Sequence, residues 1–228
     1  MSRIARVVVP GLPHHVTQRG NNRAPIFFQP GDQDLYRDLL AARCRKAGVA
    51  VWAYCLMPNH VHLIMVPARA DGLARAVGEA HRRYTAFVNA RARQTGHLFQ
   101  ARFSSVPMDE GHLAAALRYV ALNPVRARLV ARAADWPWSS VAAHLAGRDD
   151  ALASVAPALD RFPDFAALIE TEPTEAELAA IRAGESIGRP LGSPAFVADL
   201  ERRLGRRLIP RKRGPRPKSS GEGEDLLI

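Results

Sequence analysis

Cysteines and long hydrophobic runs are what this 228-residue chain most clearly lacks. It has only two cysteines, Cys44 and Cys55, which do not form a C-x-x-C pair, so we expect a reducing cytoplasm rather than a disulfide framework. The apolar run near the N-terminus is cut at Pro10 and is too short for a signal peptide, and no later run approaches the length of a membrane span. We therefore expect a soluble, intracellular protein with no membrane partner.

Acidic residues are also few. Asp and Glu number 22 against 32 Lys and Arg, which gives a formal net charge of +10 and a sequence pI near 10.7. This excess favours a polyanionic partner, although a basic surface can also serve solubility alone. Many cations crowd into the Pro- and Gly-interrupted C-terminus, where Arg211, Lys212 and Arg213 are expected to bind phosphates without sequence preference.

The hydrophobic periodicity predicts an α+β fold. Strands are expected at 14–19, 49–57, 60–66 and 97–106, and helices at 32–47, 71–95 and from Asp109 to Asn123. The helix at 71–95 is expected to expose a face that carries His81 and several arginines. This order predicts a ferredoxin-like antiparallel sheet with helices packed on one face.

The C-terminal third differs in composition from the rest. Alanine-rich, irregular sequence begins near residue 146, so we divide the chain into a core domain at 1–145, a mostly helical extension at 146–208 and a basic, disordered tail at 209–228. Within the extension, one short helix is expected to begin at Thr174 and a second after Gly192-Ser193-Pro194. The tryptophans Trp136 and Trp138 are expected only to pack.

Two histidines lie one residue apart in the predicted strand that follows the turn Pro58-Asn59. Side chains alternate along a strand, so His60 and His62 share one face. Two imidazoles at this spacing can bind one metal ion. A pair of satisfied polar residues on an exposed strand face has the same pattern, so the motif alone leaves both interpretations open.

Tyr119 and Asn123 lie one turn apart on the same face of the helix that Asp109 begins. If they converge on His60 and His62, two imidazoles and an amide oxygen leave positions open for a phosphate oxygen on Mg²⁺ or Mn²⁺. Tyrosine, with an unperturbed pKa of about 10, is a weak nucleophile at neutral pH, and a metal ion that polarises the phosphate offsets this. Because Pro124 disfavours helical geometry at Asn123, a role for Asn123 as a helix terminus is the rival explanation.

Five motifs, in this order, resemble the IS200-like single-tyrosine (HUH) transposases, specifically the REP-associated tyrosine transposase branch. They are His15–Asn21, Met57–Leu63, Gly96–Phe103, Tyr119–Ala127 and Trp136–Ser140. The similarity covers residues 1–145 and marks them as the catalytic domain.

The resemblance implies His60, His62 and Asn123 as ligands of Mg²⁺ or Mn²⁺, and Tyr119 as a nucleophile that forms a 5′-phosphotyrosine intermediate. It also implies single-stranded DNA, often a hairpin from a palindromic repeat, as substrate, a homodimer, and a place at the nucleoid in the cytoplasm. Four further arginines are predicted to contact DNA together with the tail: Arg19, Arg23, Arg102 and Arg126.

Two other functions fit parts of the pattern. A DNA-hairpin binding protein could keep the fold with little or no transposition activity. A zinc hydrolase built on His60 and His62 needs a third strong ligand and a general base, and the remaining histidines, His15 among them, offer no clear motif for these. The intact set with Tyr119 and Asn123 favours a metal-dependent nuclease and strand transferase.

Overall fold

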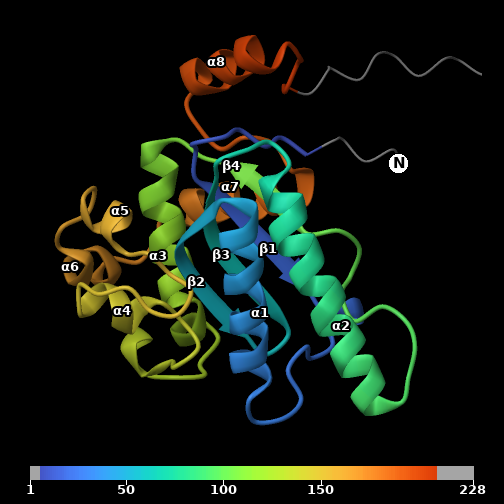
Figure 1. The fold of residues 1–228 in the computed structure, drawn as a ribbon. Coiled ribbons are helices and arrows are strands. Elements are labelled where there is room, and N and C mark those ends of the chain that lie inside the picture. The colour runs from blue at the N-terminus through green and yellow to red at the C-terminus, as the bar shows by residue number, and fades with distance from the viewer. Residues whose placement is uncertain (1–5, 210–228) are drawn as a thin grey trace, which may run out of the picture.

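A four-stranded antiparallel sheet forms the centre of the fold in the computed structural model, which describes residues 6–209 (Figure 1). Its strands, in the spatial order β2-β3-β1-β4, are β1 (His14–Arg19), β2 (Val49–Met57), β3 (His60–Pro67) and β4 (Ser104–Pro107). The alternation of strands and helices along the chain is that of the predicted ferredoxin-like unit.

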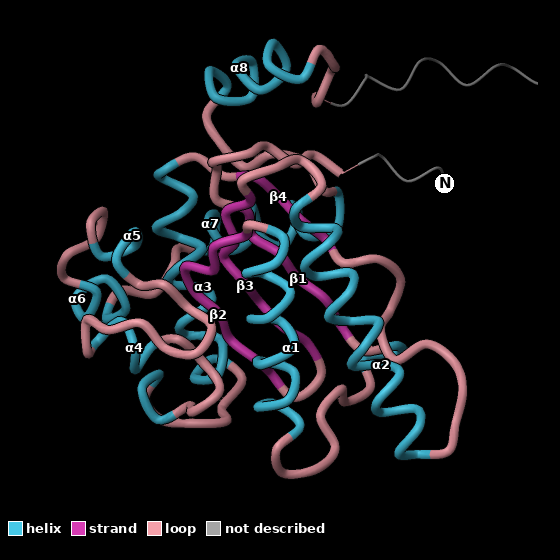
Figure 2. Tube along the Cα trace, in the orientation of Figure 1, coloured by secondary structure: helices cyan, strands magenta, loops and turns pink. Residues whose placement is uncertain are grey.

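Helices cover both faces of this sheet (Figures 1 and 2). One face packs against α1 (Asp32–Ala47) and α2 (Glu79–Ala92), and the other against α3 (Glu110–Arg126) and α7 (Glu175–Ile187). The prediction of helices on one face was therefore incomplete. β2 is buried at every position except Ala50, and a strand that is apolar on both sides requires cover on both sides.

The end of α1 and the start of α3 lie where Gly48 and Asp109 predict them. Gly48 ends α1 in the left-handed conformation, with φ of 64°, and the Asp109 side chain accepts a hydrogen bond from the His112 backbone N–H at the start of α3. The expected helix terminus at Asn123 is wrong, because α3 runs without interruption through Pro124 to Arg126; the helix beyond Pro124 that the sequence of residues 125–130 also indicates is present only as far as Arg126. Proline removes one N–H donor, and the surrounding turns still form their hydrogen bonds, including Ala127 N–H to Asn123 O at 2.9 Å.

Two predicted elements are shorter than expected. A π-helical turn, η2 (Ala74–Gly78), precedes α2, which ends at Ala92 rather than residue 95. The predicted strand at 97–106 is wrong up to residue 103: that stretch is a loop, and Ala101 has a left-handed φ of 56°. The Gln18 side-chain amide holds this loop by donating to the backbone oxygens of Gln100 and Ala101, both at 3.2 Å.

An aromatic cluster fills the space between the sheet, α1 and α2. The Tyr36 hydroxyl and His81 Nε2 form a buried hydrogen bond of 2.8 Å, and the Tyr84 hydroxyl donates to Ile26 O at 2.7 Å. The prediction that His81 is exposed is wrong, because its ring stacks on Phe99 with centroids 4.3 Å apart. Contacts from the 97–103 loop, which the helix periodicity does not reveal, cover it.

The Trp136–Ser140 segment lies along the outer edge of β2. The Trp136 indole donates to Leu56 O at 3.1 Å, the Leu56 N–H donates to Trp138 O at 2.8 Å, and the Tyr54 N–H donates to the Ser140 hydroxyl at 2.9 Å. The tryptophans thus have the packing role expected of them.

Short helices complete the chain. They are η1 (Asn21–Arg23), η3 (Ala133–Asp135), α4 (Val141–Leu145), α5 (Ala156–Leu159), α6 (Phe165–Glu170) and α8 (Pro194–Leu204). Both helices expected in the extension are present, α7 with a capping box between Thr174 and Glu177, and α8 after Ser193. Across residues 6–209, no helix is both long and apolar enough to cross a bilayer. Arg211, Lys212 and Arg213 lie outside the described residues.

Candidate functional site

His60 and His62 lie on the sheet face that α3 covers. Their rings are 4.7 Å apart between centroids and nearly perpendicular, with His62 buried and His60 half-buried. His60 Nδ1 lies 2.6 Å from Asn59 Oδ1, and the amide oxygen can only accept, so this nitrogen donates and Nε2 keeps its lone pair. Asn59 thus orients the ring in the way that carboxamides and carboxylates orient metal-binding histidines.

Tyr119 reaches the same place from α3. Its ring meets the His62 ring edge-on, with centroids 5.2 Å apart, and is nearly fully buried. His60, His62 and Tyr119 are therefore brought together on one side of the sheet. Asn123 is half-buried one turn further along α3, and no hydrogen bond joins its amide to a histidine within the described residues.

Burial controls protonation in this site. It lowers the pKa of His15 to about 3 and, with the nearby charge of Arg19, that of His60 to about 4, and it lowers the pKa of His62 well below its usual value. All three imidazoles are neutral at pH 7, which is the form that binds a metal ion.

The Tyr119 phenol is held in its protonated form. Burial raises its pKa, and the neighbouring Glu185 carboxylate adds to this effect. Arg182 and Arg126 act in the opposite direction, Arg182 also through a hydrogen bond, and the Arg126 guanidinium carbon lies 5.5 Å from the centre of the tyrosine ring. Arg182 and Arg126 can therefore stabilise negative charge that develops at the phenol oxygen during a reaction.

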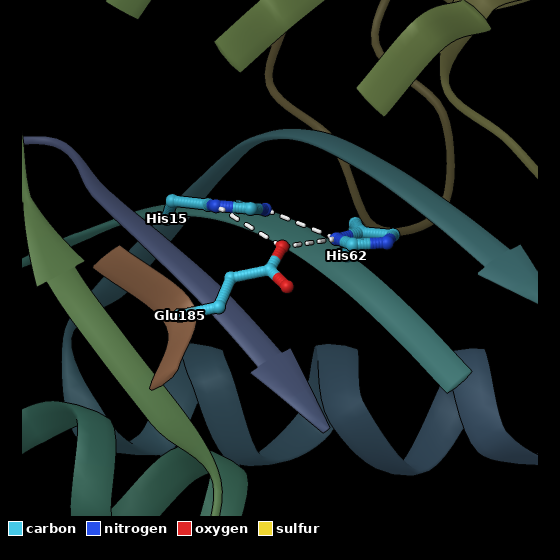
Figure 3. A group of neighbouring side chains, drawn as sticks. All are labelled: His15, His62 and Glu185. Carbon is cyan, nitrogen blue, oxygen red and sulfur yellow. Dashed lines mark hydrogen bonds and ion pairs between the residues drawn. The ribbon is translucent and has the colours of Figure 1, made fainter. Parts of the chain in front are cut away.

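Two residues that the sequence did not single out complete the cluster (Figure 3). His15, on β1, places Nε2 3.1 Å from His62 Nδ1, and Glu185, on α7, places Oε1 3.7 Å from His62 Nδ1 and 3.9 Å from His15 Nδ1. The three side chains could together hold a metal ion. Strand alternation could have placed His15 on the right face, but nothing in the sequence marks Glu185.

Buried polar atoms remain unsatisfied here. His15 Nδ1, His62 Nε2 and Glu185 Oε1 have no hydrogen-bond partner. Burial raises the pKa of Glu185 to about 7, while Arg19 and Arg182 partly oppose this rise. Buried polar groups are normally paired, so these atoms mark a place that a ligand can complete.

A basic groove of about 520 Å³ opens beside the cluster. Its charged and histidine lining comprises Arg19, His60, His62, Arg102, Arg182 and Glu185. Two of the predicted DNA contacts, Arg19 and Arg102, thus line the groove, and Arg126 lies beside Tyr119. Arg23 is exposed, and its backbone oxygen accepts a hydrogen bond from the Asn59 amide.

Comparisons with known proteins agree on the kind of protein this resembles. The family model described as "Transposase IS200 like" matches residues 8–123. A Haemophilus influenzae protein that bears the name REP-associated tyrosine transposase is 28% identical over 116 residues, an alignment that spans 46% of this chain and 66% of that protein, just under two thirds of its length.

Two solved structures are similar as well. A REP-associated tyrosine transposase bound to a REP hairpin superposes with a TM-score of 0.56 and 21% identity, over 68% of this chain and 93% of the other. A transposase from Deinococcus radiodurans has a TM-score of 0.37 and 22% identity, over 52% of this chain and 95% of the other. At 21% identity, the first of these supports the fold.

Proposed function

Because the chain belongs to the IS200-like transposases, we propose that it cleaves and rejoins single-stranded DNA with Tyr119 as the nucleophile. The observation that carries this proposal is the position of Tyr119: its ring lies against His62 of the His60–His62 pair, beside a groove lined by Arg19 and Arg102. This is the only one of the four tyrosines that combines a histidine pair with an adjacent basic groove within residues 6–209.

In the proposed reaction the arginines of the groove bind the DNA backbone and place one phosphodiester at Tyr119. The tyrosine oxygen attacks phosphorus, the bond from phosphorus to the 3′ oxygen breaks, the phenolic proton passes to water in the groove, and the leaving 3′ oxygen takes up a proton from water. The products are a 5′-phosphotyrosine and a free 3′ hydroxyl. Attack of a 3′ hydroxyl on the phosphotyrosine reverses these bond changes and joins strands, so Tyr119 is regenerated.

We also propose Mg²⁺ or Mn²⁺ as the cofactor, held by His60, His62 and Asn123. The two histidines fit this role: both imidazoles are neutral, Asn59 directs His60 so that Nε2 is available, and His62 Nε2 is buried without a partner. When bound, the ion would polarise the phosphate and stabilise charge as it develops. Arg126 and Arg182, beside Tyr119, would stabilise the same charge from the protein side.

The proposed substrate is single-stranded DNA or the hairpin of a palindromic repeat, met at the nucleoid in the cytoplasm. A structural relative was solved with a REP hairpin, and this chain has the same fold together with a net charge of +10. The excess of positive charge supports a nucleic-acid partner in general, and the groove provides a place for an unpaired strand.

The test incubates the full chain with end-labelled hairpin DNA and Mg²⁺ or Mn²⁺, followed by a denaturing gel. We expect a covalent protein–DNA adduct that is absent from Tyr119→Phe and present in Tyr84→Phe, a matched change on the opposite face. An adduct that persists in Tyr119→Phe would remove Tyr119 as nucleophile. Hairpin binding without any adduct in the wild-type chain would instead support a DNA-binding protein that has lost its chemistry.

A further inference from the structure

We propose that His15, His62 and Glu185 form a divalent-cation site of their own, in which the C-terminal extension supplies the only carboxylate (Figure 3). It is an alternative to the ligand set proposed above: the two sets share His62, and a neutral imidazole has one free lone pair, so His62 serves one of them at a time. The motif set needs a ligand from α3, whereas this set joins β1, β3 and α7.

The spacing of the donor atoms suits a shared ion better than it suits hydrogen bonds. Glu185 Oε1 is 3.7 Å from His62 Nδ1 and 3.9 Å from His15 Nδ1, and all three ligand atoms lie within 4.8 Å of one another. The two distances to the carboxylate are too long for hydrogen bonds, whereas His15 Nε2 and His62 Nδ1 do form a hydrogen bond at 3.1 Å, which a bound ion would replace. Two ligands that each lie about 2.0–2.2 Å from one ion are separated by roughly 3–4 Å, and both carboxylate distances fall in this range.

The unsatisfied atoms lead to the same conclusion. His15 Nδ1 and Glu185 Oε1 are buried and lack hydrogen-bond partners. Arg19 and Arg182 are close enough to influence Glu185, yet within the described residues no ion pair joins either arginine to the carboxylate, whose Oε1 lies 3.7 and 3.9 Å from the two neutral imidazoles. A bound cation would satisfy the carboxylate oxygen and the His15 nitrogen at once.

The position of the Glu185 carboxylate is fixed because its backbone is hydrogen-bonded to the sheet. The Ser104 hydroxyl, on β4, donates to the Glu185 backbone oxygen at 2.8 Å, so α7 is fixed to the sheet at the residue that faces the histidines. Glu185 and His62 also line the basic groove, which leaves room for water or a phosphate oxygen to complete the coordination of an ion.

The donor set indicates the class of ion. Two imidazoles and one carboxylate are typical ligands of Zn²⁺ and of other first-row transition ions, whereas Mg²⁺ prefers oxygen ligands and keeps most of its water. The site is therefore expected to bind Zn²⁺ or Mn²⁺ in preference to Mg²⁺. Because α7 lies outside residues 8–123, this site would tie the extension to the part of the chain that matches the family.

The experiment measures metal binding rather than cleavage. The full chain, stripped of metal with EDTA, is titrated with Zn²⁺ by calorimetry and with Co²⁺ by visible absorption. We expect Glu185→Gln and His15→Gln each to weaken binding at least about tenfold. Glu175→Gln, a change of the same kind on an exposed turn of α7, should bind as the wild type does.

Two results would overturn the site. One is wild-type affinity in Glu185→Gln; the other is an affinity that falls with His60→Gln or Asn123→Ala but not with Glu185→Gln. Thermal unfolding with and without Zn²⁺ distinguishes loss of the site from failure to fold. The ion should raise the Tm of the wild type and of Glu175→Gln but not that of Glu185→Gln. Tyr119→Phe keeps metal binding even if no adduct ever forms, so failure of the cleavage proposal is distinguished from failure of this one.

Discussion

The two faces of the sheet treat their buried polar groups in opposite ways. On the face covered by α1 and α2, Tyr36 is hydrogen-bonded to His81, and Asp32 receives two hydrogen bonds from Arg91, at 2.6 and 2.8 Å. On the face covered by α3 and α7, Tyr119 and His62 meet ring to edge, and His62 Nε2 has no partner. Both faces bury a tyrosine against a histidine, but of these two histidines only His62 keeps a buried nitrogen, Nε2, without a partner.

This difference separates stability from chemistry within one small fold. A buried polar group that is hydrogen-bonded stabilises the fold modestly. A buried polar group without a partner lowers the stability of the fold until a ligand binds it. The closed face keeps the sheet and its helices together. The open face, with Glu185 Oε1 also unpaired, keeps its donors available for an ion or a phosphate.

The strongest test of this difference between the two faces replaces one histidine on each face with alanine. His62→Ala should lower the rate of DNA cleavage per folded molecule by about 100-fold or more, because it removes a proposed metal ligand; it also loses the packing of a buried ring against Tyr119. His81→Ala should leave cleavage per folded molecule unchanged while costing about 2 kcal/mol, since it leaves the Tyr36 hydroxyl unpaired. Cleavage assays beside urea unfolding of each variant measure both; a folded His81→Ala that fails to cleave would refute the division.

Asp32→Asn tests the ion pair of the closed face. The Arg91 guanidinium lowers the pKa of Asp32 below its ordinary value of 3.8, and Asp32 is almost fully buried. Arg91 is about a quarter exposed, so solvent weakens the pair, and we expect a loss of about 2 kcal/mol at pH 7.

The pH dependence of this loss has a definite sign. The depressed pKa means that the stabilisation is complete above the unfolded pKa and disappears as the pH falls through the folded one. The stabilities of wild type and Asp32→Asn, measured by urea unfolding, should therefore begin to converge as the pH falls below about 4 and meet only below the folded pKa of Asp32. A gap that stays constant from pH 7 to pH 3 would show that the charge of Asp32 contributes nothing.

Tyr36→Phe and Tyr119→Phe form the next pair. Tyr36→Phe should cost about 1 kcal/mol because His81 loses its hydrogen-bond partner. Tyr119→Phe should cost less, because the change keeps the ring contact with His62 and removes only the hydrogen bond between the hydroxyl and the exposed Arg182. Midpoints from urea unfolding compare the two, and a larger loss for Tyr119→Phe would assign that residue a structural role.

The smallest expected effect is that of Arg102→Ala. Arg102 lines the groove and forms no ion pair within residues 6–209, so its loss should weaken hairpin DNA binding only a few-fold and lower the salt slope by about 1. Arg132→Ala is the control, because that arginine is paired with Asp135 at the surface. Fluorescence anisotropy at several salt concentrations distinguishes them; equal effects would place the DNA elsewhere.

Local patterns predicted the parts of the site that depend on neighbours in sequence. Alternation placed His60 and His62 on one face, and helical spacing placed Tyr119 on the stripe that turns toward them. The end of α3 was misjudged because the effect of Pro124 on one residue was weighed without the packing that carries the helix onward. The alternating residues of the 97–103 loop resembled a strand, although a left-handed turn at Ala101 buries Phe99 and Phe103 instead.

Local sequence patterns could not predict that the extension contributes Glu185 to the site. Glu185 reaches His62 only because α7 packs against β4 and α3, and such a contact depends on the tertiary arrangement rather than on spacing. His15 was visible in sequence but had no partner there to suggest a role. The division of the chain at residue 146 stays a prediction, although Leu152, Ala153 and Val155 share the main core.

The aromatic segment along β2 also bears on how copies of this chain can assemble. Its hydrogen bonds to Tyr54 and Leu56 occupy backbone groups that a second sheet would need for joining edge to edge. The opposite edge, β4, is only four residues long, and the chain at Leu191 bonds to its end through Pro107 O. Within the described part of the chain, the β2 edge is therefore closed to a second sheet along Tyr54 to Leu56, and the other edge offers only the short strand β4.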